Sequence, residues 1–510
     1  MTRSDVLIVG AGPTGLVLAL WLTKLGANIR IVDKTAEPGT TSRALAVHAR
    51  TLELYCQLGL ADIVLARGHK VPAARLWLQG EPKARVSFEQ VGAELTRYSF
   101  LHIFPQDEHE RLLIATLEGL GVSVERNTEL LGYTDEGAGV IARLRRPDGQ
   151  EERCQAAYIA GCDGAHSIVR ETMGTGYPGG TYRHLFYVAD VEASGPTIDG
   201  ELHVDLEEAD FLAVFPLTGK GHARLIGTVR DDRADLADTL RFDDVSGRVI
   251  ENLKVQVQKV NWFSTYHVHH RVTQHFRKGS AFLLGDAAHI HSPAGGQGMN
   301  TGIGDAINLA WKLKAVLGRG ASDAILDTYE NERIAFAQRL VKTTDRVFTL
   351  ATAEGRIASL LRTRIAPVAV PTLAKFEAVR DFLFRTVSQI TVNYRHCAFN
   401  AGQAGDIHGG DRLPWVMAEG TDNYQPLAHM DWQVHVYGRA KPDLAAWCKE
   451  HGVPLHVFAW GSECEEAGII RDTLYLLRPD TYLGLVDRSC SAETLRRYLD
   501  ARGMRIGMIN

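Results

Sequence analysis

The sequence predicts an α/β protein, and two distant stretches carry this prediction. Residues 5–34 read DVLIVGAGPTGLVLALWLTKLGANIRIVDK, the pattern of a buried strand, a glycine-rich turn, a helix and a second strand. Residues 281–317 again place a short apolar strand before a glycine-rich loop and an amphipathic helix. The first pattern is typical of a Rossmann-like unit, and 510 residues suffice for about three domains.

The glycines at 10–15, the first glycine motif, have separate tasks in such a unit. Gly10 permits the tight turn, Gly12 lets the backbone approach a pyrophosphate, and Gly15 lets the helix pack closely on the sheet. Asp33 ends the second strand, where its carboxylate can accept hydrogen bonds from a ribose. The pattern predicts a bound dinucleotide and leaves FAD and NAD as alternatives. The expected contacts are Gly10, Gly12, Pro13, Gly15, Asp33 and Lys34.

Residues 285–300, GDAAHIHSPAGGQGMN, form the second glycine motif. Asp286 follows the apolar strand at the carboxyl edge of the sheet, where its carboxylate can hold a sugar-alcohol chain. The glycines allow close backbone approach, and a helix is expected from about Thr301. Amides at that helix start would stabilise the negative charge of a reduced flavin without a basic side chain. These amides belong to Gly298, Met299 and Asn300.

The composition favours a cytoplasmic protein that binds small molecules. A net charge of −5 without a long basic run argues against a nucleic acid or an anionic membrane as the main partner. The seven cysteines form no CxxC, which suits a reducing compartment. The apolar run at 6–22 is interrupted by glycines, which argues against an export signal, and no later segment contains the roughly 18 apolar residues of a membrane span.

The two motifs and several others resemble the single-component (class A) FAD-dependent aromatic hydroxylases, the group of para-hydroxybenzoate hydroxylase. Within that group the chain is most similar to the phenol hydroxylase and polyketide hydroxylase branch. The shared motifs are GAGPTG at 10–15, SRALAVHARTLEL at 42–54, FPQDEHERLL at 104–113, AGCDGAHSIVR at 160–170, the second glycine motif, and YENER at 329–333. They follow the order of the family.

The resemblance implies that both glycine motifs bind one FAD, with its ADP half at the first. Arg43 and Gln106 match positions near the pyrophosphate and ribose. Asp163 and Gly164 match a motif that serves both FAD and NAD(P)H, and Asp286 matches the ligand of the ribityl chain. The positions expected to line the isoalloxazine ring are Pro293, Gly298, Met299 and Asn300.

The resemblance also implies a GR2-type FAD-binding domain with an inserted mixed β-sheet substrate domain. The FAD-binding domain is expected at 1–180 and, with bridging helices, at 276–395, and the sheet at 181–275. Residues 396–510 predict strand, helix, strand, two strands and helix, as in a thioredoxin-like domain without CxxC that packs on the body or stabilises a homodimer. Candidate cavity residues, which are equally compatible with ordinary core, are Phe211, Phe215 and Arg224.

The reaction implied by the resemblance is oxygen insertion into a phenolic or polycyclic aromatic substrate. In the family, NADH or NADPH reduces FAD, which then adds dioxygen to give a C4a-hydroperoxide. His48 and Pro293 are the candidate catalytic residues. An imidazole of ordinary pKa suits removal of a phenolic proton at neutral pH, although His48 is equally compatible with a structural role. The histidines between 267 and 275 lack a matching carboxylate or cysteine, so we predict no metal site.

Two alternatives remain open from the sequence. The same fold can perform Baeyer–Villiger oxidation, epoxidation, dehalogenation or dehydrogenation. A different class of function is a flavin-bearing scaffold that acts through its C-terminal part. The choice between NADH and NADPH is also open.

Overall fold

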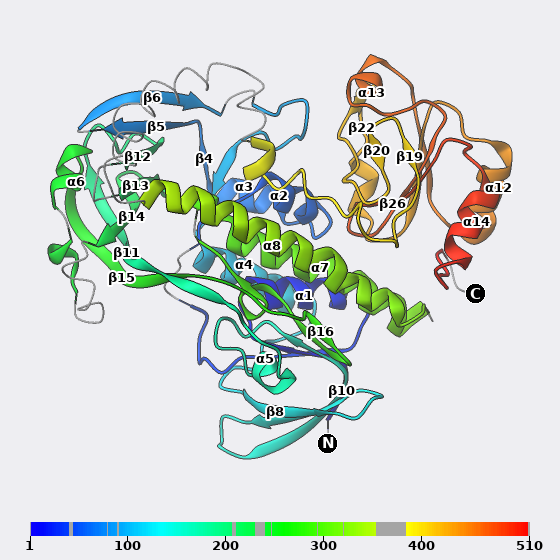
Figure 1. The fold of residues 1–510 in the computed structure, drawn as a ribbon, viewed down its shortest axis with the longest axis horizontal. Coiled ribbons are helices and arrows are strands. Elements are labelled where there is room, and N and C mark those ends of the chain that lie inside the picture. The colour runs from blue at the N-terminus through cyan, green and yellow to red at the C-terminus, as the bar shows by residue number, and fades with distance from the viewer. Residues whose placement is uncertain are drawn as a thin grey trace.

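The computed structural model describes residues 2–39, 44–78, 80–88, 91–206, 211–229, 240–245, 247–292, 294–319, 321–352 and 384–507. Within these residues, Figure 1 shows two large sheets with long helices between them and a separate sheet in the C-terminal part. None of the helices in the described ranges is long and apolar enough to cross a bilayer.

A seven-stranded sheet carries the first glycine motif. Its main path runs β16-β17-β10-β1-β2, with β8 and β9 added through β10. The strands are β1 (Thr2–Val9), β2 (Ile29–Val32), β8 (Glu129–Asp135), β9 (Val140–Arg145), β10 (Glu151–Gly161), β16 (Arg277–Lys278) and β17 (Ala281–Leu283). Because β1, β10 and β17 run parallel, the turns that follow them lie at the same edge of the sheet.

Four long helices pack with this sheet: α1 (Pro13–Lys24), α4 (Gln106–Gly119), α7 (Gln297–Arg319) and α8 (Ala324–Thr352). Helix α7 begins four residues before the predicted Thr301. The reason is local, because the Asn300 side chain donates to the carbonyl of Gly296 at 2.9 Å and holds the last glycines in a helical turn. Shorter helices are α2 (Ala49–Cys56), α3 (Ala61–Arg67) and α5 (Ile168–Met173).

An eight-stranded sheet forms the second body, in the order β18-β15-β11-β14-β13-β12-β5-β6. The strands are β5 (Ala73–Leu78), β6 (Glu81–Ser87), β11 (Gly179–Ser194), β12 (Leu202–Leu206), β13 (Phe211–Pro216), β14 (His222–Val229), β15 (Gln256–Val272) and β18 (His289–Ile290). The sheet is thus larger than the segment 181–275, since β5 and β6 join one edge and β18, from the second glycine motif, joins the other. Helix α6 (Gly247–Asn252) contacts β13, and β3 (Ala46–Val47), β4 (His69–Val71) and β7 (Leu101–Ile103) form a small separate sheet.

The C-terminal part contains a four-stranded sheet in the order β24-β23-β25-β26. Its elements are β23 (Gln433–Tyr437), α12 (Pro442–His451), β24 (Leu455–Phe458), α13 (Ser462–Glu466), β25 (Leu474–Leu477), β26 (Leu483–Asp487) and α14 (Ala492–Asp500). The predicted order of strands and helices is confirmed, with the short α13 in addition. Two small hairpins precede the sheet, β19 (Gln403–Ala404) with β20 (Ile407–His408) and β21 (Met417–Ala418) with β22 (Thr421–Asp422).

The C-terminal part is joined to the rest of the molecule by a shared apolar core. Trp311 of α7 packs edge-to-face on Trp432, with ring centroids 5.6 Å apart, and Phe399 contacts both rings.

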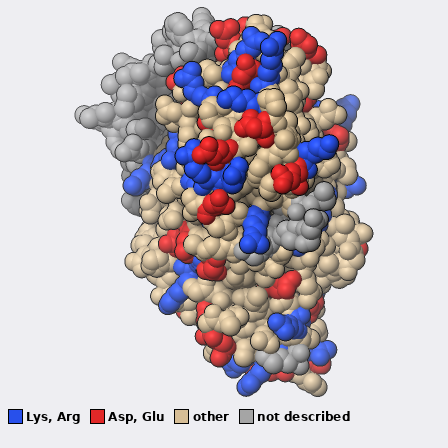
Figure 2. All heavy atoms as spheres, turned by 90° about the vertical axis from the view of Figure 1, so that its right-hand side faces the viewer, with Lys and Arg blue, Asp and Glu red and all other residues tan. Residues whose placement is uncertain are grey.

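The side of the molecule that carries the C-terminal part shows acidic and basic side chains interspersed, without a large patch of one sign (Figure 2). That face therefore offers no broad field to a highly charged partner.

Candidate functional site

In the first glycine motif, two glycines have no room for a side chain and one has open space beside it. A Cβ on Gly10, which has φ of 100°, would lie 2.3 Å from the carbonyl oxygen of Cys162. A Cβ on Gly15 would lie 2.0 Å from the carbonyl oxygen of Gly10. A Cβ on Gly12 would meet no atom within 4 Å, and Gly12 is the N-cap of α1 with no side chain capping the helix. The turn therefore leaves space at the amides and positive dipole of α1, where a phosphate binds well.

Asp33 lies beside this turn, as its position after β2 predicts. Its Oδ2 accepts a hydrogen bond from the amide of Ala11 at 2.7 Å, and its Oδ1 accepts from the amide and hydroxyl of Thr35. A carboxylate has about four acceptor positions, so Asp33 retains capacity for a ribose hydroxyl. The neighbouring Lys34 is exposed to solvent.

Asp163 follows β10 at the same edge of the sheet and has one unused oxygen. Its Oδ2 accepts from the amide of Val169 at 3.2 Å, whereas the buried Oδ1 has no hydrogen-bond partner among the described residues. Burial raises the pKa of Asp163. Gly164, with φ of 77°, would have open space at its Cβ. A buried acceptor without a donor is costly, so this corner is suited to a ligand that supplies the donor.

The two glycine motifs meet at Thr14 in α1. A Cβ on Gly285 would lie 2.7 Å from Thr14 Oγ1, and a Cβ on Gly302 would lie 2.2 Å from the same atom. Asp286 therefore lies beside the start of α1, in a 3-10 turn (Gly285–Ala287), with its side chain exposed. Its backbone carbonyl accepts from the hydroxyl of Tyr177 at 2.7 Å. The two motifs, nearly three hundred residues apart in the sequence, are thus brought together by glycines that pack on Thr14.

Of the remaining predicted contacts, Gln106 is described and two are not. Gln106 is the first residue of α4; its amide donates to Ala44 at 3.1 Å and its side chain to Glu110 at 2.8 Å. Arg43 and Pro293 lie outside the described residues.

Asn300 connects the second glycine motif to the start of α2. Its Oδ1 accepts from the backbone amide of His48 at 2.9 Å and from the hydroxyl of Thr51 at 2.7 Å. Its Nδ2 donates to the carbonyls of Ala46 and Gly296, both at 2.9 Å. Sequence reasoning singled out the Asn300 amide but missed this side-chain role, because nothing in the local pattern shows that α2 lies opposite.

Two buried histidines flank the same loop. His48 Nε2 lies 2.9 Å from the carbonyl of Gly295, so Nε2 carries the proton and the buried Nδ1 is a bare acceptor. His291 Nδ1 lies 2.9 Å from the carbonyl of Ser292, which leaves its buried Nε2 bare. Burial lowers the pKa of each imidazole to about 4. The expectation of an ordinary pKa for His48 is therefore wrong, because the loop covers the ring and removes the water that would solvate its charge.

Behind the motif, Asp305 of α7 joins three elements. Its Oδ2 accepts from the amide of Gly285 at 3.0 Å and lies 2.7 Å from His289 Nε2, while its Oδ1 accepts from Arg333 of α8 at 2.6 Å. Burial opposes ionisation of Asp305, but the Arg333 guanidinium lowers the pKa of that carboxyl. Gly285 and His289 of the second glycine motif are thus held by a buried cluster of Asp305 and Arg333.

Comparisons with known proteins identify the family of the chain. A family model described as an FAD binding domain matches residues 3–344. The chain belongs to this family of FAD-dependent aromatic monooxygenases. It is 38% identical to 6-methylpretetramide 4-monooxygenase of Streptomyces rimosus over 389 residues, which cover 76% of this chain and 68% of the relative.

Two longer matches extend the relationship over nearly the whole chain. The chain is 33% identical over 497 residues to 12-dehydrotetracycline 5-monooxygenase/anhydrotetracycline 6-monooxygenase of Streptomyces rimosus subsp. rimosus, covering 94% of this chain and 95% of the relative. The solved structure of the OxyS anhydrotetracycline hydroxylase from Streptomyces rimosus superposes with a TM-score of 0.77 at 28% identity, covering 98% and 99% of the two chains. The resemblance to aromatic hydroxylases is confirmed.

In this monooxygenase the candidate cavity residues Phe211, Phe215 and Arg224 lie on β13 and β14 of the eight-stranded sheet. Phe215 pairs with Arg224, which pairs with Asp190, so these three side chains share a face. Arg224 donates to both Asp190 oxygens at 2.6 Å. Phe215 packs in the cluster that contains Ala46, whose carbonyl bonds Asn300, whereas Phe211 packs with Phe186 in a neighbouring cluster.

The described residues of the monooxygenase fit an FAD molecule in space and in charge. Gly12 leaves room for the pyrophosphate, and the buried Asp163 Oδ1 has no hydrogen-bond donor among the described residues. The first turn of α7 has backbone amides that can face the ring of FAD. No group of three or more His, Cys, Asp and Glu side chains that could hold a metal ion occurs in the described ranges.

Proposed function

We propose that this monooxygenase hydroxylates a polycyclic phenol, with NADH or NADPH as the reductant. The observation that carries the proposal is the meeting of both glycine motifs at Thr14. Phe215 packs in the cluster that contains Ala46, whose carbonyl accepts a hydrogen bond from Asn300. One continuous site can then hold FAD and an aromatic ring side by side. The curated relatives named above, whose names describe oxidation of tetracycline precursors, support the substrate class.

We assign the ends of FAD to different parts of the chain. The ADP half is bound by Gly10, Gly12, Pro13, Gly15 and Asp33, with Gln106 and Asp163 next to it; Arg43 and Lys34 remain proposed contacts at its edge. The ribityl chain is held by Asp286, and the ring by the first turn of α7 and by Pro293. Bound FAD supplies the activation of dioxygen and the transfer of one oxygen atom to the substrate.

The chain itself supplies charge stabilisation and a dry cavity. The backbone amides of Gly298 and Met299 lie in the first turn of α7, at its positive end, where they stabilise negative charge on the ring. The sheet that carries Phe215 excludes water from the reacting atoms. Arg224 is tied to Asp190, so it acts in the sheet as part of an ion pair.

His48 is proposed to orient the substrate hydroxyl. Its bare Nδ1 accepts the hydroxyl hydrogen, and the hydrogen bond from Nε2 to Gly295 fixes the ring. With a pKa of about 4 the ring is neutral at physiological pH and accepts a hydrogen bond at all working pH values. His48 is a weaker base than an exposed histidine. We therefore propose that it mainly positions the phenol and contributes only in part to removal of the phenolic proton.

We further propose the division into an FAD-binding domain (1–180 and 276–395), a sheet domain (181–275) and a thioredoxin-like domain (396–510). Support for the last comes from the order β24-β23-β25-β26, in which β23 and β24 are parallel and the other pairs are antiparallel. All seven cysteines are free thiols, which supports a cytoplasmic location, and the lack of a CxxC argues against a disulfide exchange role for this domain.

The test is to reconstitute the protein with FAD and to measure NADH and NADPH oxidation with a panel of polycyclic phenols. We expect ring phenols to accelerate oxidation of one reductant and ¹⁸O₂ to place one labelled oxygen on the product ring. A labelled lactone or epoxide as the product would show that the enzyme performs another oxygen insertion and not hydroxylation. A product without label would contradict the proposal, and so would a well-folded protein that remains colourless with FAD.

A further inference from the structure

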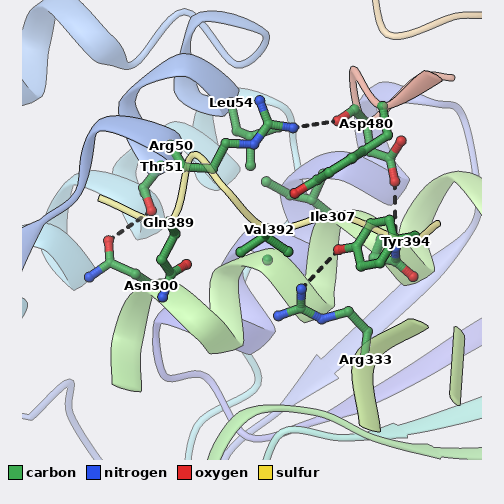
Figure 3. A pocket seen from close by; sticks show the side chains of 13 residues that line it. Arg50, Thr51, Leu54, Asn300, Ile307, Arg333, Gln389, Val392, Tyr394 and Asp480 are labelled. Carbon is green, nitrogen blue, oxygen red and sulfur yellow. Dashed lines mark hydrogen bonds between the residues drawn. The ribbon is translucent and has the colours of Figure 1, made fainter. Parts of the chain in front are cut away.

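One turn of the C-terminal part contacts the first turn of α2. Residues 478–482 connect β25 to β26 and project between α2, α7 and α8. Arg50 of α2 donates from Nη2 to the carbonyl of Asp480 at 3.0 Å and to Thr481 Oγ1 at 2.8 Å. Figure 3 shows the Arg50 guanidinium directed at Asp480, while the neighbouring Thr51 is directed at Asn300.

The same first turn of α2 holds the second glycine motif. Thr51, next to Arg50, donates to Asn300 Oδ1 at 2.7 Å, and the amide of His48 donates to the same oxygen at 2.9 Å. One side of this turn is therefore attached to the C-terminal turn and the other side to the start of α7. A displacement of the turn at Arg50 would be transmitted to Asn300 over a single helical turn.

A small cavity lies between these elements. It has a volume of about 20 Å³, enough for about one water molecule. Its walls come from α2, α7, α8, the segment before the C-terminal part and the turn 478–482; they include Arg50, Thr51, Asn300, Gln389, Asp480 and Tyr482. At the edge of this cavity the hydrogen bonds of Arg50 join the first turn of α2 to the turn 478–482, and Gln57 joins the other end of α2 to the carbonyl of Pro479 at 2.7 Å.

Attachment of the C-terminal part does not need Arg50. A separate buried network joins Arg478 to Glu332 at 2.6 Å, Arg478 to Asp480 at 2.6 Å and Lys312 to Glu332 at 2.8 Å. Its two cations and two anions balance, and all four side chains are almost fully buried. This network anchors the turn on α7 and α8.

Arg50 is not needed for charge balance either. Glu53 pairs with Arg50 at 3.1 Å and also with Arg412, which donates to both of its oxygens at 2.9 and 2.5 Å. Two guanidinium groups thus share one carboxylate, and Arg412 alone would neutralise it. A second buried cation is costly, so its presence calls for a role in geometry.

We propose that Arg50 is a positioning residue of the FAD site, and that the turn 478–482 is the support it acts against. The C-terminal part then completes the site by holding the first turn of α2 on Asn300. This inference rests on the FAD placement proposed above. It makes FAD affinity depend on a contact between α2 and a loop that lies outside the FAD-binding family match at 3–344.

The test compares Arg50→Gln with the matched control Arg412→Gln in the full chain. Each variant removes one buried guanidinium from Glu53, and each leaves the other in place. We expect Arg50→Gln to raise the FAD dissociation constant about tenfold and to shift the absorption spectrum of bound FAD, since hydrogen bonds from a charged donor are lost. Arg412→Gln should lower the thermal midpoint of the apoprotein more than Arg50→Gln does, with FAD affinity unchanged.

Two further variants keep the inference testable if Arg50→Gln folds poorly. Arg50→Lys places an ammonium near the same two oxygens and should restore most of the affinity. Thr481→Val removes only one acceptor and should weaken FAD binding about threefold. Equal FAD affinity in Arg50→Gln and wild type, or equal loss in Arg50→Gln and Arg412→Gln, would overturn the inference. Failure of the wild type to bind FAD would instead overturn the proposed function.

Discussion

The two glycine motifs reach the same site by different physical means. In the first, at 10–15, Gly15 packs on Gly10 only five residues away, and Gly10 also lies against the carbonyl of Cys162 at the end of β10. The second, at 285–300, depends on side chains from α2, α8 and, through Arg50, the C-terminal turn. The contact of Gly15 in the first motif is therefore local, whereas the second motif is held by side chains far away in the chain.

The sharpest test of the local character of the first motif is a pair of alanine substitutions. Gly15→Ala places a Cβ 2.0 Å from a carbonyl oxygen and should lower the free energy of unfolding by about 3 kcal/mol. Gly12→Ala adds its methyl to open space, so stability should stay within about 0.5 kcal/mol while FAD affinity falls about a hundredfold. Chemical denaturation of the apoproteins and FAD titration measure both. Equal destabilisation would remove the distinction.

Asn300→Ala tests the long-range character of the second motif. The substitution leaves the amide of His48, the hydroxyl of Thr51 and the carbonyl of Ala46 without their partner. We expect a loss of about 3 kcal/mol in unfolding free energy, with weaker FAD binding. Asn300→Asp, which keeps the acceptor but loses the donor, serves as control and should retain the bonds from His48 and Thr51. An unchanged denaturation midpoint for Asn300→Ala would show that α2 is held by other contacts.

His48, which lies beside the second motif, should contribute to the acid sensitivity of the protein. The folded pKa of His48 lies at about 4, below its ordinary value of 6.5, so the folded state resists protonation while the unfolded state does not. Its contribution is fully present above pH 6.5 and is lost as the pH falls towards 4, a loss of about 3 kcal/mol. His48→Asn should flatten the stability profile in that window. A profile parallel to wild type would show that the ring is solvated.

The smallest effect is expected at the edge of the first motif, with the opposite sign. Burial raises the pKa of Asp163, so the folded apoprotein prefers the protonated carboxyl, and this contribution is lost as the pH rises through the folded pKa. Asp163→Asn should therefore stabilise the apoprotein at neutral pH and lose that advantage in acid. Thermal midpoints without FAD at several pH values measure it. A variant less stable than wild type at neutral pH would mean that Oδ1 has a donor after all.

Some features of the site were accessible from the sequence because they depend on neighbours in the chain. The task of Gly15 follows from its contact with Gly10 only five residues away, and the strand and helix order at 396–510 follows from periodicity. The start of α7 was placed four residues too late, since the hydrogen bond from Asn300 to Gly296 is a side-chain contact that periodicity does not express.

The amino-acid sequence by itself determined that this protein has two glycine motifs at the carboxyl ends of strands, because backbone conformation there depends on adjacent residues. The tertiary structure alone decided that β5 and β6 extend the substrate sheet, that His48 is a neutral acceptor and that Arg50 contacts the turn at Asp480. These properties arise from burial and from hydrogen bonds between residues hundreds of positions apart. Solvent exclusion and electrostatic pairing depend on distance in space, which the order of residues does not contain.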